Sequence, residues 1–158
     1  MAYPDVKVEI KGLKEVNAAL QAYGKDLGNN LELIVKATAQ NALRDVRNAI
    51  ENPPKTGRVY YKGKNRDIKH QASKEGEAPA TDGGALLTST YIENRGKYGR
   101  AIGSRLPYAY YLEFGTKSKK LEKRPAWIPA VERAIPRMLK LINIAIAKAK
   151  ARAEKTTK

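Results

Sequence analysis

The sequence contains no cysteine, only one histidine, and no apolar run close to the roughly 20 residues that a membrane-spanning helix needs. Without cysteine, neither a disulfide framework nor a cysteine zinc site can form, and an intracellular protein is the simpler expectation. Residues 1–9 lack the apolar core of a secretion signal. We therefore expect a soluble protein that does not enter a membrane.

Few residues are suited to catalysis. His70 is the only histidine and lies in a segment rich in glycine and lysine, so neither a catalytic triad nor a conventional zinc site can be assembled around it. The acids after residue 54 are scattered among bases, whereas a magnesium-dependent nuclease needs several carboxylates that converge on one metal. Residues 81–84 lack the lysine of a phosphate-binding loop and are typical of a turn. We expect His70 to be an exposed loop residue, and the protein to be no enzyme and to use no cofactor or metal.

Positive charge is abundant. Lysine and arginine number 31, and aspartate and glutamate 16, which gives a formal net charge of +15. Residues 1–54 hold seven charges of each sign, so the whole excess lies after residue 54. This asymmetry favours a polyanionic partner, either nucleic acid or an acidic protein surface. A solvated basic surface that only keeps the protein soluble is equally compatible with it.

The first part of the chain predicts a strand and two helices. The length of 158 residues and the 42% hydrophobic content fit one domain with one modest core. Residues 6–10 alternate apolar and charged side chains, as a short strand does. Apolar steps of three and four predict an amphipathic helix over residues 13–26, with Gly24 and Gly28 allowing a turn at its end.

A second helix and a long loop are expected next. The second helix should begin at Asn29 or Asn30, either of which can cap it, and stop at Asn52, because two prolines follow. Residues 55–84 are rich in glycine and charge, and we expect a long mobile segment that orders mainly against a partner. Residues 59–62 can form a brief strand within it.

The last part of the chain predicts a hairpin and two more helices. Residues 88–93 and 98–104 should form the two arms of the hairpin, and residues 107–114 a short helix. A basic loop follows, and a long helix should begin near Ile128 and be kinked or split at Pro136.

After about residue 147 the chain becomes a basic tail, which we expect to be frayed over residues 148–158. The elements together predict a single α+β domain over residues 1–158. In it, a small antiparallel β-sheet packs against the N-terminal helices and the long C-terminal helix.

Aromatic residues lie in basic surroundings. Aromatic side chains among bases can stack on nucleobases. They serve equally well as core filling or as anchors at a protein interface, where they are enriched, and we favour core and interface. The residues concerned are Tyr60, Tyr61, Tyr108, Tyr110, Tyr111, Phe114 and Trp127.

Three segments carry a family resemblance. Residues 77–90 have a proline, then Thr-x-Gly, then leucines and serine; residues 106–116 read Pro-Tyr-Ala and then Glu-x-Gly-Thr; residues 124–130 read Arg-Pro, an aromatic residue and Pro-Ala. In this order they resemble the tail-component family of long-tailed phages related to HK97, which is grouped with tail completion and head-to-tail joining proteins. The chain departs from the family pattern in the extra glycine pair at 83–84 and the strongly basic loop at 55–74.

The resemblance implies a structural neck or tail subunit of the virion, assembled in the host cytoplasm. Such subunits form a ring, with six copies as the expected number, between the head connector and the tail tube. A ring closes by heterologous contacts, so one face of each copy must match a different face of the next. The partners would be copies of the chain and other neck and tail proteins, with transient DNA contact in the lumen. Residues 55–84 and the basic tail are candidates for these contacts, and would order on assembly.

Several residues are candidates for the subunit interface. They are Tyr60, Tyr61, Pro79, Leu86, Tyr108, Tyr110, Tyr111, Glu113, Phe114, Gly115, Thr116 and Trp127. Within this set we expect Glu113 to pair with Arg124 or with a base of a neighbouring subunit, Gly115 to take a positive φ, and Thr116 to cap the turn.

The alternative function is sequence-nonspecific nucleic-acid binding. Its bases would be those of the loop after the short helix, together with the tail, and the same bases are candidates for contacts with phosphate or an acidic partner. They are Lys117, Lys119, Lys120, Lys123 and Arg124. A nucleic-acid binder should lose affinity steeply as salt rises, whereas a ring held by apolar and mixed contacts should survive.

Overall fold

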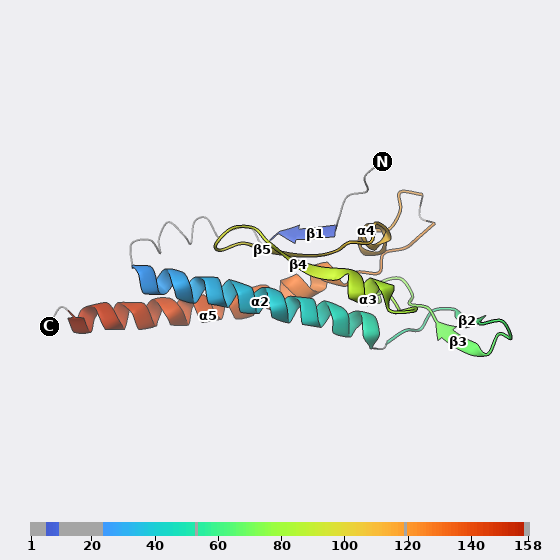
Figure 1. Ribbon diagram of the computed structural model, residues 1–158, viewed down its shortest axis with the longest axis horizontal. Helices are drawn as coiled ribbons and strands as arrows, with labels where there is room; N and C mark the ends of the chain where they lie inside the picture. Colours follow the sequence, from blue (N-terminus) through green and yellow to red (C-terminus); the bar gives the residue numbers. More distant parts are fainter. Residues whose placement is uncertain (1–5, 10–23, 53, 119, 157–158) are drawn as a thin grey trace.

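The computed structural model describes residues 6–9, 24–52, 54–118 and 120–156. It has an α+β architecture in which two long helices, α2 and α5, run antiparallel along the molecule, and a three-stranded antiparallel sheet covers one side of the pair (Figure 1). A separate two-stranded hairpin projects past one end of the helices (Figure 1). No helix in the described part of the chain is long and apolar enough to cross a membrane.

Helix α2 spans Lys25–Glu51 and buries one apolar stripe. It begins at Lys25 after Gly24, so the predicted start at Asn29 or Asn30 is wrong, and so is a turn at Gly28. A side chain at Gly28 would lie about 2.8 Å from the hydroxyl of Tyr98, so this glycine allows close packing within the helix. The predicted end is confirmed, because Asn52 caps the C-terminus. The predicted helix over residues 13–26 falls mostly outside the described residues.

Helix α5 spans Trp127–Thr156 and packs along α2. Pro136 lies inside it without splitting it, so a split at this residue is wrong. The proline is exposed, and its missing N–H therefore costs one bond on the solvent side while the buried side of the helix stays packed. The helix also continues to Thr156, so the predicted end near residue 147 is too early.

The three-stranded sheet has the order β1-β5-β4, with β1 Val6–Glu9, β5 Arg100–Ser104 and β4 Thr90–Asn94. Both pairs are antiparallel, and the predicted β4–β5 hairpin is confirmed. Strand β4 begins two residues later than expected, because Ala85–Ser89 form a short helix, α3. The Ser89 hydroxyl donates to the Leu86 carbonyl and thereby favours the helical turn.

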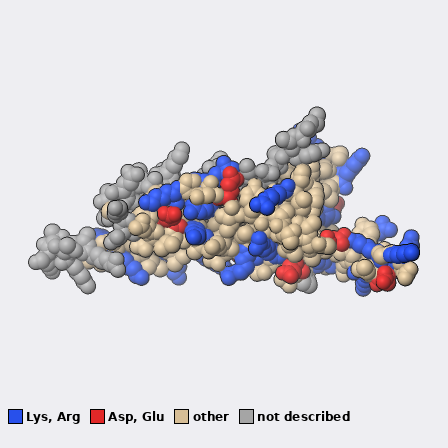
Figure 2. All heavy atoms as spheres, viewed as in Figure 1, with Lys and Arg blue, Asp and Glu red and all other residues tan. Residues whose placement is uncertain are grey.

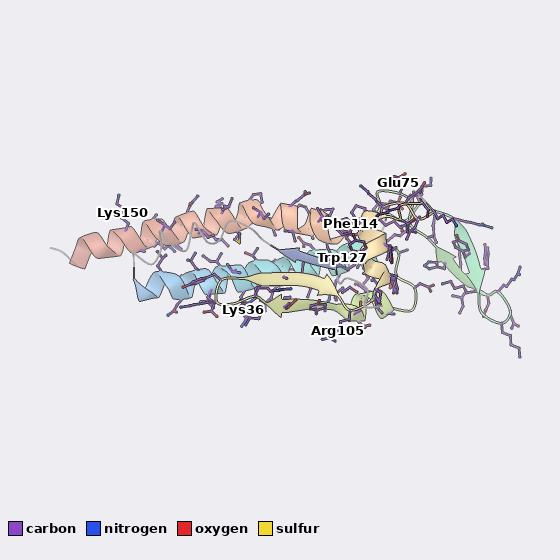
Figure 3. All side chains as sticks on the ribbon, turned by 90° about the horizontal axis from the view of Figure 1, so that it is seen from above. Lys36, Glu75, Arg105, Phe114, Trp127 and Lys150 are labelled. Atoms are coloured by element: carbon purple, nitrogen blue, oxygen red, sulfur yellow. The ribbon has the colours of Figure 1, made fainter. Side chains whose placement is uncertain are left out.

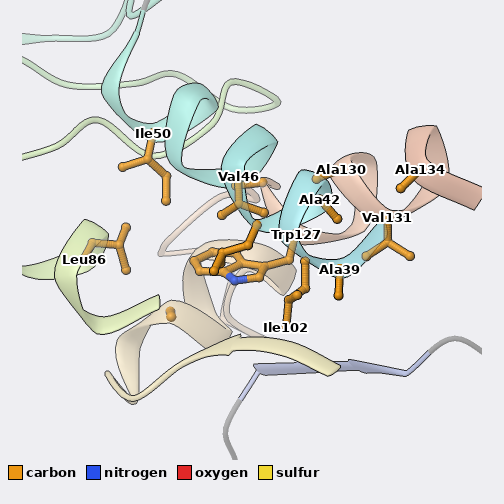
Figure 4. Packing of buried hydrophobic residues seen from close by; sticks show 13 residues of the cluster. Ala39, Ala42, Val46, Ile50, Leu86, Ile102, Trp127, Ala130, Val131 and Ala134 are labelled. Atoms are coloured by element: carbon orange, nitrogen blue, oxygen red, sulfur yellow. The ribbon is translucent and has the colours of Figure 1, made fainter. Parts of the chain in front are cut away.

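The main core lies between the middle of α2, the start of α5 and the sheet (Figure 4). Trp127 is fully buried at its centre, against Val46 and Ile102. A second buried cluster joins the first half of α2 to the middle of α5 through Leu31, Met138 and neighbouring residues. Both clusters lie along the same helix pair, so α5 is held at its start and at its middle.

The region over residues 55–84 contains more secondary structure than predicted. The expected strand Val59–Lys62 is confirmed as β2, and it pairs with β3, Ile68–Gln71, in an antiparallel hairpin. The description of this region as a loop is therefore wrong. The predicted short helix is confirmed as α4, Tyr108–Phe114.

Candidate functional site

The three segments that carry the family resemblance meet in space beside the start of α5. The N–H of Gly76, just before the first segment, donates to the carbonyl of Lys123 at 2.9 Å. The N–H of Arg124 donates to the carbonyl of Leu112 in α4 at 2.6 Å. The Arg124 Nε also donates to the carbonyl of Ser73 at 3.2 Å. We call the region formed by residues 73–84, α4 and residues 121–128 the junction.

Glu113 is the central polar residue of the junction. Its carboxylate accepts hydrogen bonds from the N–H groups of Ala126 at 2.8 Å, Trp127 at 3.1 Å and Ile128 at 2.8 Å. These N–H groups have no partner within a helix, and the N-terminus of a helix favours a negative charge. Glu113 is only 2% exposed. It therefore caps α5 from α4 and fixes the two helices to each other.

The predicted pairing of Glu113 with Arg124 or with a base of a neighbour is wrong. Both carboxylate oxygens bond to backbone N–H groups within the chain, and burial keeps other molecules away. Arg124 instead donates to the carbonyls of Ser73 and Glu122. The arginine therefore holds two loops together, and its predicted contact with phosphate or an acidic partner stays a prediction.

The turn after α4 follows the prediction. Gly115 has φ of 75°, and its N–H donates to the Tyr111 carbonyl at 2.8 Å. A Cβ there would lie about 3.0 Å from the Leu121 carbonyl oxygen, so glycine is favoured both by conformation and by space. The Thr116 hydroxyl accepts from the N–H of Leu121 at 3.0 Å, which closes the basic loop at its base.

A groove of about 250 Å³ opens beside the junction. Its lining includes His70 from β3, Ser73, Asp82, Tyr108 from α4 and Arg124. Partial burial raises the pKa of the Tyr108 phenol. His70 is partly buried in a strand, so the prediction of an exposed loop residue is wrong. Within the described residues, no three histidine, aspartate or glutamate side chains gather closely enough to hold a metal ion.

The predicted interface residues divide by burial. Exposed side chains are Tyr60, Tyr61, Tyr108 and Phe114. Partly buried residues are Tyr110, Tyr111, Gly115 and Thr116. Buried residues are Pro79, Leu86, Glu113 and Trp127. The last four fill or brace the interior, so their assignment to a contact surface is corrected. In Figure 3, Phe114 and Trp127 lie toward the start of α5, in the half of the molecule away from Lys150.

The predicted basic loop is partly available to a partner. Lys117, Lys120 and Lys123 are exposed. Lys119 lies outside the described residues. Arg124 is partly buried, so three of the five predicted bases are fully exposed on the described surface.

A clamp that was not predicted from the sequence holds the base of the β2–β3 hairpin. The Glu77 carboxylate accepts from the N–H and hydroxyl of Thr56 and from the N–H of Lys74. These bonds, with that from the Thr56 hydroxyl contributing most, lower the pKa of Glu77 to about 2. Lys55 donates to the carbonyls of Ala49 and Ala78, and burial lowers its pKa. Thr56 and Glu77 are 21 residues apart, and Lys55 and Ala78 are 23 apart, so no local sequence pattern predicts the clamp.

A basic face of α5 was also missed, although its spacing is visible in the sequence. Arg133, Arg137 and Lys140 are separated by four and three residues, which places them on one side of the helix, and all are exposed. They form no ion pair with another described residue, although Asp45 lines a shallow groove with the two arginines. Figure 2 shows basic side chains spread over much of the visible surface.

Comparisons of the chain with protein-family models, with curated proteins and with solved structures give no match.

Proposed function

We propose that this chain is a structural subunit of the neck or tail of a long-tailed phage, a tail completion or head-to-tail joining protein. Copies of it assemble into a ring, with six as the expected number, between the head connector and the tail tube. The sequence resemblance supports this proposal. So does the way in which its three segments converge on one junction, because residues far apart in sequence then serve a common structural purpose.

The observation that carries the proposal is the presence of large exposed apolar side chains on separate parts of the molecule. Tyr108 and Phe114 are exposed on α4, at the end where α5 begins. Leu141 and Ile144 are exposed about 21–26 Å further along α5, on one side of that helix. A ring that closes by heterologous contacts needs two different faces on each copy, and these two patches meet that requirement.

The test is the mass of the purified protein in solution, measured by light scattering. Wild type is expected to form a particle of several subunits. Leu141→Lys combined with Ile144→Lys should give single subunits, because two charges cannot be desolvated in an apolar contact. The matched control is Asn143→Lys with Gln40→Lys, which adds two lysines at exposed positions, one of α5 away from the side of Leu141 and Ile144 and one of α2.

The outcomes separate clearly. A wild-type protein that stays a single subunit at all accessible concentrations would contradict the ring. Equal loss of mass in both lysine pairs would show that α5 does not provide a specific face. Immuno-gold imaging of a phage particle that contains the protein should place the label between head and tail, and labelling elsewhere would contradict the location.

The second candidate is sequence-nonspecific nucleic-acid binding, and the basic face of α5 is the observation in its favour. Glu132 is the only acid among the described side chains of this helix. Neutralising phosphates releases counterions, so the logarithm of the binding constant should fall linearly with the logarithm of salt concentration. Replacing Arg137 with alanine should reduce that slope by about 1 if the side chain contacts one phosphate. A slope that stays unchanged would argue against this face.

A further inference from the structure

The β2–β3 hairpin is an incomplete sheet. Tyr60 is 45% exposed, Tyr61 60% and Ile68 59%. The two strands pair with each other, and no third strand of the described residues extends this sheet at either edge. A two-stranded hairpin alone is at best marginally stable in water, and open edges with apolar side chains invite pairing with another chain.

The base of the hairpin is nevertheless fixed to the body. The N–H of Gly57 donates to the Ala72 carbonyl at 2.8 Å and closes the two arms at their base, and the Lys62 ammonium pairs with Asp82 of the following loop. The Glu77 carboxylate holds Thr56 at the start of the hairpin. The hairpin is therefore presented in one orientation past the end of the helices (Figure 1), and its outer part stays open to a partner.

Charge indicates the kind of partner. Lys64, Arg66 and Lys69 lie at or near the tip, all are exposed, and none forms an ion pair with another described residue. Asp67 is the only acid in residues 55–71. Copies in the proposed ring meet through their apolar patches, and the basic tip would gain nothing from the basic surface of such a copy. Complementarity therefore favours an acidic partner of a different kind.

Side-chain chemistry favours a protein over a nucleic acid. The Arg58 guanidinium lies 5.3 Å from the centroid of the Tyr60 ring, so one face of that ring already contacts a cation and is closed to a nucleobase. Ile68 gains from apolar contact, which a phosphate backbone does not supply. The open strand edges match the backbone of an added strand, which carries N–H and C=O groups at the same spacing.

We propose that the β2–β3 hairpin binds an extended acidic segment of another protein, which adds as a third strand at one edge. Ile68 covers its apolar side chains on one face of the hairpin. Lys69, on the opposite face, and the bases at the tip pair with its carboxylates. The inference rests on the proposed function in one respect only, namely that the acidic protein is a neighbour in the assembly.

The experiment measures binding of labelled probes to the full-length protein by fluorescence anisotropy at about 0.1 M salt. The main probe is a peptide of about ten residues in which glutamate alternates with valine. A second peptide has proline in place of alternate valines, which removes backbone donors. A third has lysine in place of glutamate, and the fourth probe is a DNA duplex of about 20 base pairs. We expect the first peptide to bind, and the proline and lysine peptides to bind at least about tenfold more weakly.

Matched charge reversals locate the site. A triple variant of the hairpin tip should bind the acidic peptide about tenfold or more weakly than wild type. Its substitutions are Lys64→Glu, Arg66→Glu and Lys69→Glu. A control variant makes the same change of charge on α5, and its affinity for the acidic peptide should differ from that of wild type by less than about twofold. Its substitutions are Arg133→Glu, Arg137→Glu and Lys140→Glu. A milder variant, Ile68→Ser, keeps the charges and should also weaken binding of the acidic peptide. An unchanged circular dichroism spectrum shows that each variant is folded.

Each contrary outcome overturns the inference. Equal weakening by both triple variants would mean general electrostatic attraction. Unchanged binding of the proline peptide would exclude strand addition, and a duplex that binds at the hairpin while the acidic peptide does not would identify a nucleic-acid site. If the protein forms a ring but does not bind the peptide, only the hairpin inference is contradicted. If the protein binds the peptide but stays a single subunit, only the ring is contradicted.

Discussion

At the scale of single residues, one buried carboxylate does the work of a helix cap from a distance. Glu113 accepts three N–H groups at the start of α5, although it lies 13 residues before the first of them. Ordinary capping residues lie within the first turn and depend on local geometry. Glu113 depends instead on the turn at Gly115 and on the loop that returns the chain to α4.

Replacing Glu113 with glutamine should destabilise the protein. A glutamine side chain turns one acceptor into an N–H₂ donor that faces backbone donors, and leaves at least one buried N–H without a partner. We expect a loss of about 1–3 kcal/mol in the free energy of unfolding, measured by urea denaturation. Glu122→Gln, on the exposed side of the same loop, is the control and should change it by less than about 0.5 kcal/mol. Equal effects would contradict the capping role.

Glu77 should make the stability depend on pH in a defined range. Its pKa in the folded protein, about 2, lies below the ordinary value of 4.5, so folding favours the ionised form. Its contribution is therefore complete above pH 4.5 and is lost as pH falls toward about 2. The difference in unfolding free energy between wild type and Glu77→Gln should narrow over this range.

Glu75→Gln provides the comparison for this measurement. Glu75 is exposed, lies two residues away and makes no hydrogen bond to another described residue. Its substitution should leave the stability close to that of wild type at neutral pH. A wild-type stability that exceeds that of Glu77→Gln by the same amount at pH 2 and pH 5 would contradict the clamp.

At the scale of elements, α5 tolerates a proline that a freestanding helix would not. Replacing Pro136 with alanine restores an N–H that can donate to the carbonyl of Glu132 and removes a steric clash. We expect the free energy of unfolding to rise by about 1–3 kcal/mol, seen as a higher midpoint in urea. Lys140→Ala, exposed on the same helix, should change it by less than about 0.5 kcal/mol. A lower midpoint for Pro136→Ala would indicate that packing requires the proline.

The periodicity of the sequence predicted most elements but misplaced several boundaries. The α2 stripe, the strand Val59–Lys62 and α4 are local patterns, and the structure confirms them. The errors occur where tertiary contacts prevail over local rules. From the sequence alone, Gly28 is typical of a turn. In the structure it lies inside α2, where the Tyr98 hydroxyl approaches too closely for a side chain.

The site was less accessible to sequence reasoning. The positive φ of Gly115 and the role of Thr116 follow from local chemistry and were predicted. The partners of Glu113 and Arg124 are backbone groups brought close by the fold, and no spacing in the sequence specifies them. Exposure of Tyr61 and burial of Trp127 likewise depend on tertiary position, so composition assigned both to one interface.

At the scale of the whole molecule, a net charge of +15 opposes folding through self-repulsion. Raising sodium chloride from about 0.02 M to about 0.5 M shortens the range of this repulsion. The free energy of unfolding in urea should rise on the order of 1 kcal/mol. The triple glutamate variant of the basic face of α5 lowers the formal charge by six and should show a weaker dependence on salt. A fall in wild-type stability with salt would mean that attractive ion pairs dominate.

The bond between Glu113 and the start of α5 also has a mechanical consequence. Phe114, next to Glu113, is exposed, whereas α5 extends from that point about 34 Å to Lys150. If a neighbouring molecule binds Phe114 and rotates α4 by about 5°, rigid transmission through the capped end would displace Lys150 by about 3 Å. Binding at the start of α5 would thus reach its far end, through a small shift of α5 against α2 at the second buried cluster.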